Sequence, residues 1–245
     1  MTDEAVHFAT CPQQSLPDCP ADRWKLTIDA CVEFRWPDVD RVVVVSPHPD
    51  DETLGLGGLI SMACARGLEV LVIAVTNGEA GGYGADLGNV RSRELDEALR
   101  TLGGATCIAI ERLRLPDGSV HDHDCELRDQ LELLCRSSDL LCCPLIDDWH
   151  SDHEATSRAV RHVGRKINCD IRWYPIWSWE AHDPATSRLR RSERIVLTET
   201  AQERKRKAMF CYASQLTGRE PVLSSRVLDH FCRDVEMLLR PSWSD

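Results

Sequence analysis

The pattern of apolar and polar positions divides most of the chain into short apolar runs that alternate with amphipathic segments. Continuous apolar runs rich in β-branched residues are typical of parallel strands that are buried on both faces. These runs lie at 41–46, 68–76, 106–110, 139–143 and 171–176. Helical periodicity marks the segments at 53–66, 89–102, 124–135 and 151–163. The alternation predicts an α/β, Rossmann-like fold with a mostly parallel sheet and helices on both faces.

The two ends of the chain depart from this alternation. Residues 1–40 have weak periodicity and predict a loose N-terminal arm with one short helix near 24–32. After the last apolar run, 193–197 predicts an antiparallel or edge strand, and 200–212 and 225–238 predict helices. Because the chain has no repeat and no low-complexity segment, we expect a single domain over 1–245.

Charge narrows the classes of partner. The net charge of -11 argues against a general surface for nucleic acid or anionic membrane, because phosphate binding needs a basic footprint. A basic run at 204–207 falls in a helical pattern among glutamates and is interpreted as a solvated helix face. No apolar stretch is long enough to span a bilayer, and no apolar leader opens the sequence.

The twelve cysteines contain no Cys-x-x-Cys pair, and most lie in apolar runs. Free cysteine in such positions behaves as a small apolar side chain. We therefore expect a protein of the reducing cytoplasm without disulfide bonds.

Two polar clusters follow expected strands. His48, Asp50 and Asp51 come directly after 41–46, and a His-Ser-Asp-His cluster at 150–153 follows 139–143. Open α/β sheets place their active sites at the carboxyl ends of parallel strands, so we expect the clusters to meet. Two histidines and one carboxylate hold Zn²⁺ and leave a position for water, although Fe²⁺ also accepts this set. The pattern therefore predicts a metal-dependent hydrolase.

Within each cluster we expect different residues to have different roles. The proline between His48 and Asp50 stiffens the first loop, so that one of Asp50 and Asp51 binds metal while the other faces the metal-bound water. One of His150 and His153 ligates while the other points at substrate. Asp152 would hydrogen-bond an imidazole and set its tautomer.

These motifs resemble the zinc-dependent N-deacetylases of the LmbE/PIG-L type. The family hallmark, Pro/Ala-His-Pro-Asp-Asp-Glu after a strand, is matched at 47–52, and its later His-x-Asp-His is matched at 150–153. Weaker marks at 76–79, at Arg91 and Glu94, and at 212–215 follow in the right order, so the resemblance covers about 41–215.

The resemblance implies removal of an N-acetyl group from an amino sugar or sugar conjugate, with zinc as the cofactor. It implies His48, Asp51 and His153 as metal ligands, Asp50 as general base, and His150, oriented by Asp152, as the group that stabilises the oxyanion. Glu79, Arg91 and Asp117 fall where family members contact the sugar. The partner expected is a small N-acetylated sugar or glycoconjugate, not nucleic acid or membrane.

Several alternatives stay open on the sequence alone. The same metal centre would serve an amidase that acts on a thiol conjugate or another amide. A nucleotide-binding module is suggested by Gly55-x-Gly57-Gly58, but acidic residues precede it and the full G-x-G-x-x-G is missing. Where some family members carry a tyrosine, this chain has Asp148-Trp149, and Trp177 and Trp179 belong either to the core or to a platform for a sugar face or acyl chain.

Overall fold

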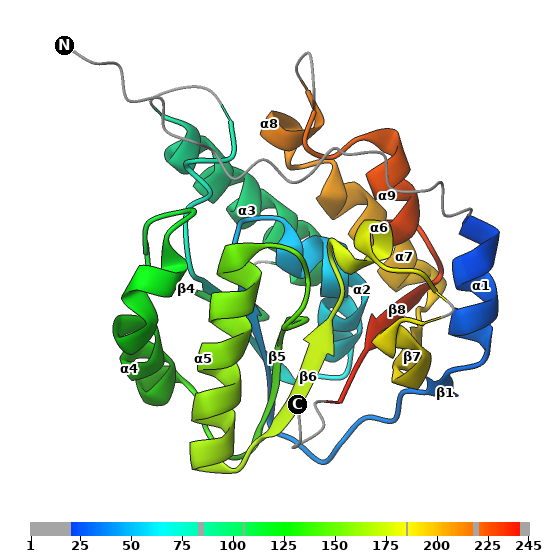
Figure 1. The fold of residues 1–245 in the computed structure, drawn as a ribbon, viewed down its shortest axis with the longest axis horizontal. Helices are drawn as coiled ribbons and strands as arrows, with labels where there is room; N and C mark the ends of the chain where they lie inside the picture. Colours follow the sequence, from blue (N-terminus) through cyan, green and yellow to red (C-terminus); the bar gives the residue numbers. More distant parts are fainter. Residues whose placement is uncertain (1–20, 83–85, 105, 185, 218–220, 241–245) are drawn as a thin grey trace.

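The sheet at the centre of the molecule has five strands, all parallel, in the order β4-β3-β2-β5-β6. Figure 1 labels β4, β5 and β6 of this sheet. The computed structural model describes residues 21–82, 86–104, 106–184, 186–217 and 221–240. The five strands are β2 (Arg41–Ser46), β3 (Glu69–Ala74), β4 (Ile108–Arg112), β5 (Asp139–Pro144) and β6 (Asp170–Tyr174). Each corresponds to one of the apolar runs, so the predicted α/β class is confirmed.

Burial explains why these runs become strands. Every residue of β2 and β5 is buried, whereas the edge strand β4 alternates between half-buried and exposed positions. A strand in the middle of a sheet with helices on both faces has no solvent-facing side, so it needs apolar residues without interruption.

The helices form two groups. The first packs as one layer and contains α2 (Asp51–Ala65), α3 (Leu87–Gly103) and α7 (Glu199–Met209). The second contains α4 (Asp124–Leu134), α5 (Ser151–Ile167) and the short η1 (Val120–His123). The strand order runs one way from β2 to β4 and the other way from β5 to β6. Right-handed crossovers then place the helices on opposite faces and leave a switch point between β2 and β5.

A second, smaller sheet corrects the expectation for the C-terminal region. Its order is β1 (Val32–Glu33), β7 (Glu193–Val196) and β8 (Val235–Leu238). The prediction of one helix over 225–238 is wrong, because α9 ends at Phe231 and β8 pairs antiparallel with β7. An antiparallel or edge strand was expected at 193–197. β7 is the middle strand of the small sheet and so is not an edge, but it does pair antiparallel with β8. Further short helices are α6 (Ser178–Ala181), α8 (Ala213–Leu216), α9 (Ser225–Phe231) and the 3₁₀ helix η2 (Arg188–Arg191).

The N-terminal segment from residue 21 is not a loose arm. Its helix, α1 (Ala21–Asp29), begins a few residues before the expected position. Trp24 is fully buried, and its indole Nε1–H donates to the carbonyl oxygen of Trp179 at 3.1 Å. Phe34 is also buried. Residues 1–20, the remainder of the expected arm, lie outside the described residues.

One pair of cysteines contradicts the expectation of free thiols. Cys64 at the end of α2 is bonded to Cys107 just before β4, with a Cα–Cα distance of 5.8 Å. Cys142 and Cys143 behave as expected, because both are fully buried in β5. Among the described helices, none combines the length and apolar character needed to cross a bilayer.

The glycines of α2 serve packing. A Cβ atom on Gly55 would lie 2.4 Å from the ring of Tyr174 on β6, so only glycine lets the helix approach this strand. Packing against Tyr174 explains why a glycine is needed at position 55. This explanation does not require a bound phosphate group.

A buried ion pair holds α2, α7 and β8 together. Lys205 Nζ lies 2.7 Å from Glu236 Oε1, and both side chains are almost completely buried. The backbone N–H groups of Gly58 and Leu59 also donate to the Glu236 carboxylate, at 2.7 and 2.8 Å.

We expect Glu236→Ala to lower the free energy of unfolding by about 3–5 kcal/mol, because it leaves Lys205 charged and buried without its partner. Urea unfolding would measure this loss. The matched control is Glu203→Ala, which removes an exposed ion pair with Lys207 on the same helix α7 and should leave the unfolding midpoint unchanged. Equal midpoints for both variants would contradict the role of the buried pair.

Candidate metal centre

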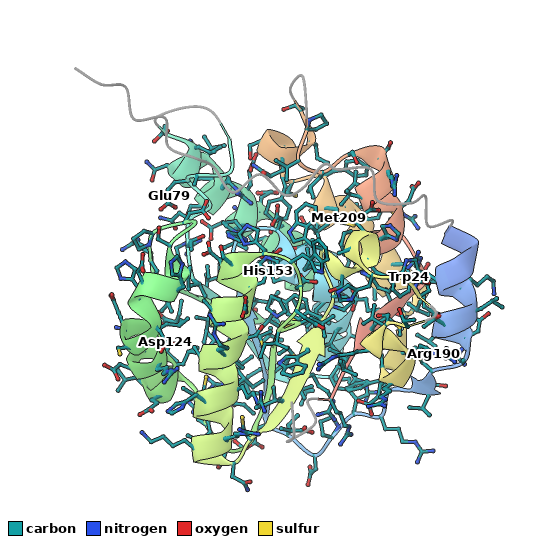
Figure 2. The ribbon with its side chains drawn as sticks, viewed as in Figure 1. Trp24, Glu79, Asp124, His153, Arg190 and Met209 are labelled. Carbon is teal, nitrogen blue, oxygen red and sulfur yellow. A yellow bond between two sulfur atoms is a disulfide. The ribbon has the colours of Figure 1, made fainter. Side chains whose placement is uncertain are left out.

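The two polar clusters meet at the switch point of the sheet. His48 and Asp51 follow β2, and His153 lies in the first turn of α5 after β5. Asp51 Oδ2 is 3.2 Å from His48 Nδ1 and 3.2 Å from His153 Nε2, and the two imidazole nitrogens are 3.4 Å apart. All three side chains are buried, and Figure 2 shows His153 near the middle of the molecule.

The three atoms have the spacing of ligands to one ion. Tetrahedral Zn²⁺ with donors at about 2.0–2.1 Å places those donors about 3.3 Å from each other. Two imidazole nitrogens and one carboxylate oxygen are also the donor types that zinc prefers in catalytic sites. The residues present therefore fit a divalent metal ion with a position left for water or substrate.

Buried carboxylates behind the imidazoles set the direction of their lone pairs. Asp148 Oδ2 lies 2.7 Å from His153 Nδ1, which makes this nitrogen the N–H donor and leaves Nε2 free to ligate. For His48 the pattern is reversed, because Nε2 lies 3.2 Å from both Asp117 and Asp152 and Nδ1 is left free.

Among the described residues, two other sets have ligand atoms that all lie within 4.8 Å of one another, and both include His48. The set with Asp117 and Asp152 offers only one imidazole beside two carboxylates, unlike the His₃ and His₂-carboxylate sets of catalytic zinc sites. The set with His150 and His153 contains no carboxylate to balance the charge of the ion.

Electrostatics at the centre favour a bound cation. Burial opposes the charge of Asp51, but the two adjacent imidazoles outweigh it and hold the pKa of this carboxyl well below its usual range. Burial likewise disfavours a charged His153, but the carboxylates of Asp51 and Asp148 raise its pKa to about 9. Both shifts favour positive charge at the point where the three side chains meet.

Asp50 differs from its neighbour. Its carboxylate lies 3.1 Å from Arg91 Nη2 and does not join the three ligand atoms. Burial raises the pKa of Asp50 to about 7; the Asp51 and Glu52 carboxylates add to this rise while Arg91 opposes it. Its backbone φ of 128° is uncommon for a residue other than glycine, and such strain occurs often at active sites. A carboxyl group with this pKa suits proton transfer near neutral pH.

His150 is held by the backbone of Asp152. The N–H of Asp152 donates to His150 Nδ1 at 3.2 Å, so the proton of the neutral ring is on Nε2. Burial, together with the neighbouring His48 and His153, lowers the pKa of His150 to about 3. The Asp152 carboxylate contacts His48, so the expected support of His150 by Asp152 comes from the backbone N–H of Asp152 and not from its carboxylate.

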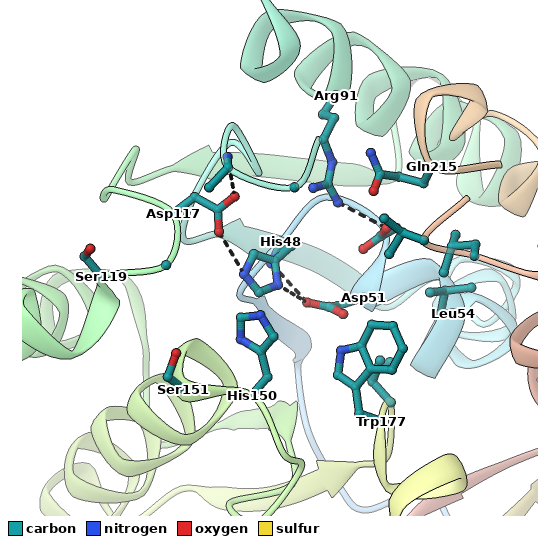
Figure 3. A pocket seen from close by; sticks show the side chains of 17 residues that line it. His48, Asp51, Leu54, Arg91, Asp117, Ser119, His150, Ser151, Trp177 and Gln215 are labelled. Atoms are coloured by element: carbon teal, nitrogen blue, oxygen red, sulfur yellow. Dashed lines mark hydrogen bonds and ion pairs between the residues drawn. The ribbon is translucent and has the colours of Figure 1, made fainter. Parts of the chain in front are cut away.

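A cavity of about 380 Å³ opens above these residues (Figure 3). Its lining residues come from the segments that follow all five strands of the central sheet and from the later residues Gln215, Val222 and Leu223. Figure 3 shows Arg91 and Gln215 on the upper side, His150 and Trp177 on the lower side, and Leu54 at the right. Polar and apolar groups both line the cavity, which suits a ligand that has both kinds of surface, as a sugar ring does.

The three residues that were expected to contact the sugar differ in their position relative to the cavity. Glu79 is exposed and lies outside the residues that line the cavity, and its carboxylate accepts the backbone N–H of Asp117 at 3.0 Å. Arg91 lines the cavity, but its guanidinium is held by Asp50 and by the carbonyl oxygens of Pro49 and Gly78. Asp117 also lines it while contacting His48.

Two functional positions were not predicted. Asp148 was treated only as a departure from the family pattern, yet its fully buried carboxylate supports His153. Gln215 lines the cavity because Ser214 binds Glu94 on α3 and Tyr212 binds Glu52 on α2. The weaker family motifs at 94 and 212–215 were the sequence signal for this contact. The sequence alone does not show that these residues contact each other.

About half of the chain matches a known protein family. A family model described as PIG-L, GlcNAc-PI de-N-acetylase, matches residues 43–163. A 1D-myo-inositol 2-acetamido-2-deoxy-alpha-D-glucopyranoside deacetylase from Corynebacterium efficiens is 38% identical, with 27% of this chain and 25% of that protein covered. The chain therefore matches about a quarter of the length of this curated relative.

Solved structures resemble most of the fold. The conserved protein TT1542 from Thermus thermophilus has a TM-score of 0.63 and 26% identity, covering 83% of this chain and 95% of that one. The A40926 pseudoaglycone deacetylase Dbv21 has a TM-score of 0.68 and 24% identity, covering 83% and 97%.

We expect metal uptake by the metal-free protein to release protons, because the ion displaces the proton that His153 holds up to about pH 9. The raised pKa stabilises the protonated form below this pH. Apparent Zn²⁺ affinity should therefore rise from pH 6 to 8, roughly tenfold per pH unit for each proton displaced. Competition with a chelator at several pH values would measure it.

The control for this experiment is Asp148→Asn, which removes one carboxylate that raises the pKa of His153. It should show a shallower dependence on pH. An affinity that is independent of pH in both proteins would contradict the assignment of His153 as a ligand.

Proposed function

We propose that this chain, whose residues 43–163 match the PIG-L family model, is a metal-dependent N-deacetylase acting on an amino sugar or sugar conjugate. The observation that carries the proposal is the convergence of His48 Nδ1, Asp51 Oδ2 and His153 Nε2 within 3.4 Å. A poised carboxyl, Asp50, and an N–H donor, His150, line the cavity beside them.

Zn²⁺ is the ion we assign to His48, Asp51 and His153, and Fe²⁺ is the alternative that the same donors accept. When bound there, such an ion lowers the pKa of water and polarises a carbonyl group. This would supply the nucleophile and the electrophilic activation that hydrolysis of an amide requires.

The chain supplies the proton transfers. Asp50 accepts the proton of the attacking water on its carboxylate and then delivers it to the departing amine nitrogen. Arg91 holds that carboxylate in place, so we assign it a positioning role and not the sugar contact first expected. His150 donates its Nε2–H to the carbonyl oxygen as negative charge develops there.

The substrate class follows from the cavity and from the relatives. One relative is a deacetylase of an acetamido-deoxy-glucopyranoside, and a structural neighbour is a pseudoaglycone deacetylase. Asp117, Ser119 and Gln215 would bind hydroxyl groups of the sugar while Trp177 faces its apolar side. The partner that we propose is thus a small N-acetylated sugar or glycoconjugate.

The cytoplasmic location remains a proposal drawn from composition. The bond between Cys64 and Cys107 provides its test, because disulfides persist in oxidising compartments and are rare in the cytosol. Thiol titration of protein isolated from its native source would show which state the pair holds there.

Asp50→Asn should retain a full equivalent of metal and lose about 10²- to 10⁴-fold in kcat, because it removes the general base but no ligand. His153→Ala should lose the metal as well. Acetate release from N-acetylglucosamine conjugates and metal content, measured on the same preparations, would separate the two effects. Asp129→Asn, an exposed site on α4, is the control, and near-wild-type rates in all three would refute the mechanism.

His150→Ala should lower kcat by about 10²- to 10³-fold with little change in metal content, since it removes one donor to the oxyanion. Steady-state kinetics beside metal analysis would test this. Loss of the metal in this variant would instead make His150 a ligand and replace Asp51 in the assigned set.

A further inference from the structure

The backbone between Asp148 and His150 adopts a conformation that suits glycine or asparagine. Trp149 has a φ of 62°, in the left-handed region that bulky side chains rarely occupy. This bend directs Asp148 inward to His153 and sends His150 into the cavity. The left-handed backbone at Trp149 is therefore explained by its two neighbours, because this conformation directs Asp148 and His150 to their places in the site.

Nothing in that backbone requires an indole. Glycine or asparagine would adopt the same φ at lower cost. Trp149 is also 52% exposed, so burial gains little stability from its large apolar ring. A strained, exposed tryptophan beside an active-site histidine therefore needs another explanation.

The indole is nevertheless fixed in place. Its Nε1–H donates to His182 Nε2 at 3.2 Å, which joins it to the end of α6. Asp148 also accepts the backbone N–H groups of Trp177 and Ser178, at 3.1 and 2.9 Å. Trp149 and Trp177 thus stand on two loops that one buried carboxylate ties together, and Trp177 lines the cavity.

We propose that Trp149 forms an outer subsite that stacks against a second sugar ring, beyond the ring that carries the N-acetyl group. Because its only polar atom is already bonded to His182, the indole presents only its apolar faces to a ligand. The C–H faces of a pyranose are suited to such a surface. The inference rests on the proposed function and assigns the second ring of an oligosaccharide or glycoside to a residue outside the cavity lining.

The test is binding to the metal-free protein, which needs no turnover. Calorimetry would compare N-acetylglucosamine with its β-linked disaccharide, N,N′-diacetylchitobiose. We expect the disaccharide to bind the wild type roughly 3- to 10-fold more tightly, as one aromatic contact supplies. Trp149→Asn should lose this preference, Trp149→Phe should retain part of it, and Asn suits the backbone, so the melting temperature should not fall.

Phe210→Asn is the matched control, since Phe210 is an exposed aromatic residue at the end of α7, and it should keep the preference. An unchanged preference in Trp149→Asn, or equal weakening of both sugars, would overturn the subsite. Absence of binding of either sugar to the wild type would overturn it as well. Binding with the expected preference but without acetate release from the metal-loaded protein would support the subsite and refute the proposed function.

Discussion

The contact on which the site depends is a buried carboxylate behind an imidazole. Asp148 fixes the tautomer of His153 and at the same time binds the loop that carries Trp177. Asp117, in the loop after β4, and Asp152, in the first turn of α5, fix the tautomer of His48. Each ring therefore turns one nitrogen toward a common point, and a small rotation of either ring would separate the three ligand atoms. The parallel sheet supplies the rigid edge from which these loops start.

The same charges give adjacent residues opposite properties. Asp50 and Asp51 are neighbours in sequence and both are buried, yet the pKa of one is raised and that of the other is lowered. The difference comes from their partners: Asp51 lies against two imidazoles, whereas Asp50 faces Arg91 and further carboxylates. Environment thus gives the two carboxyl groups of one dipeptide different properties, as the proposed roles of ligand for Asp51 and base for Asp50 require.

The sequence was sufficient for the central sheet and for the meeting of the two clusters, because continuous apolar runs and strand-end chemistry are local signals. It was insufficient where a partner far away in the sequence determines the local structure or the contact. The segment 235–238 becomes a strand because β7 lies beside it, and Cys64 finds Cys107 only in the folded chain. Asp148 carries no motif of its own, so its support of His153 became visible only in three dimensions.

The turn that carries Gln215 has a consequence for the order in which the protein forms. Tyr212 bonds to Glu52 across 160 positions of sequence, and Ser214 bonds to Glu94 across 120. The five strands of the central sheet and the three proposed metal ligands therefore all precede this turn in the chain. Because a domain folds as a unit, the wall that contains Gln215 forms only when residues near the end of the chain pack against α2 and α3.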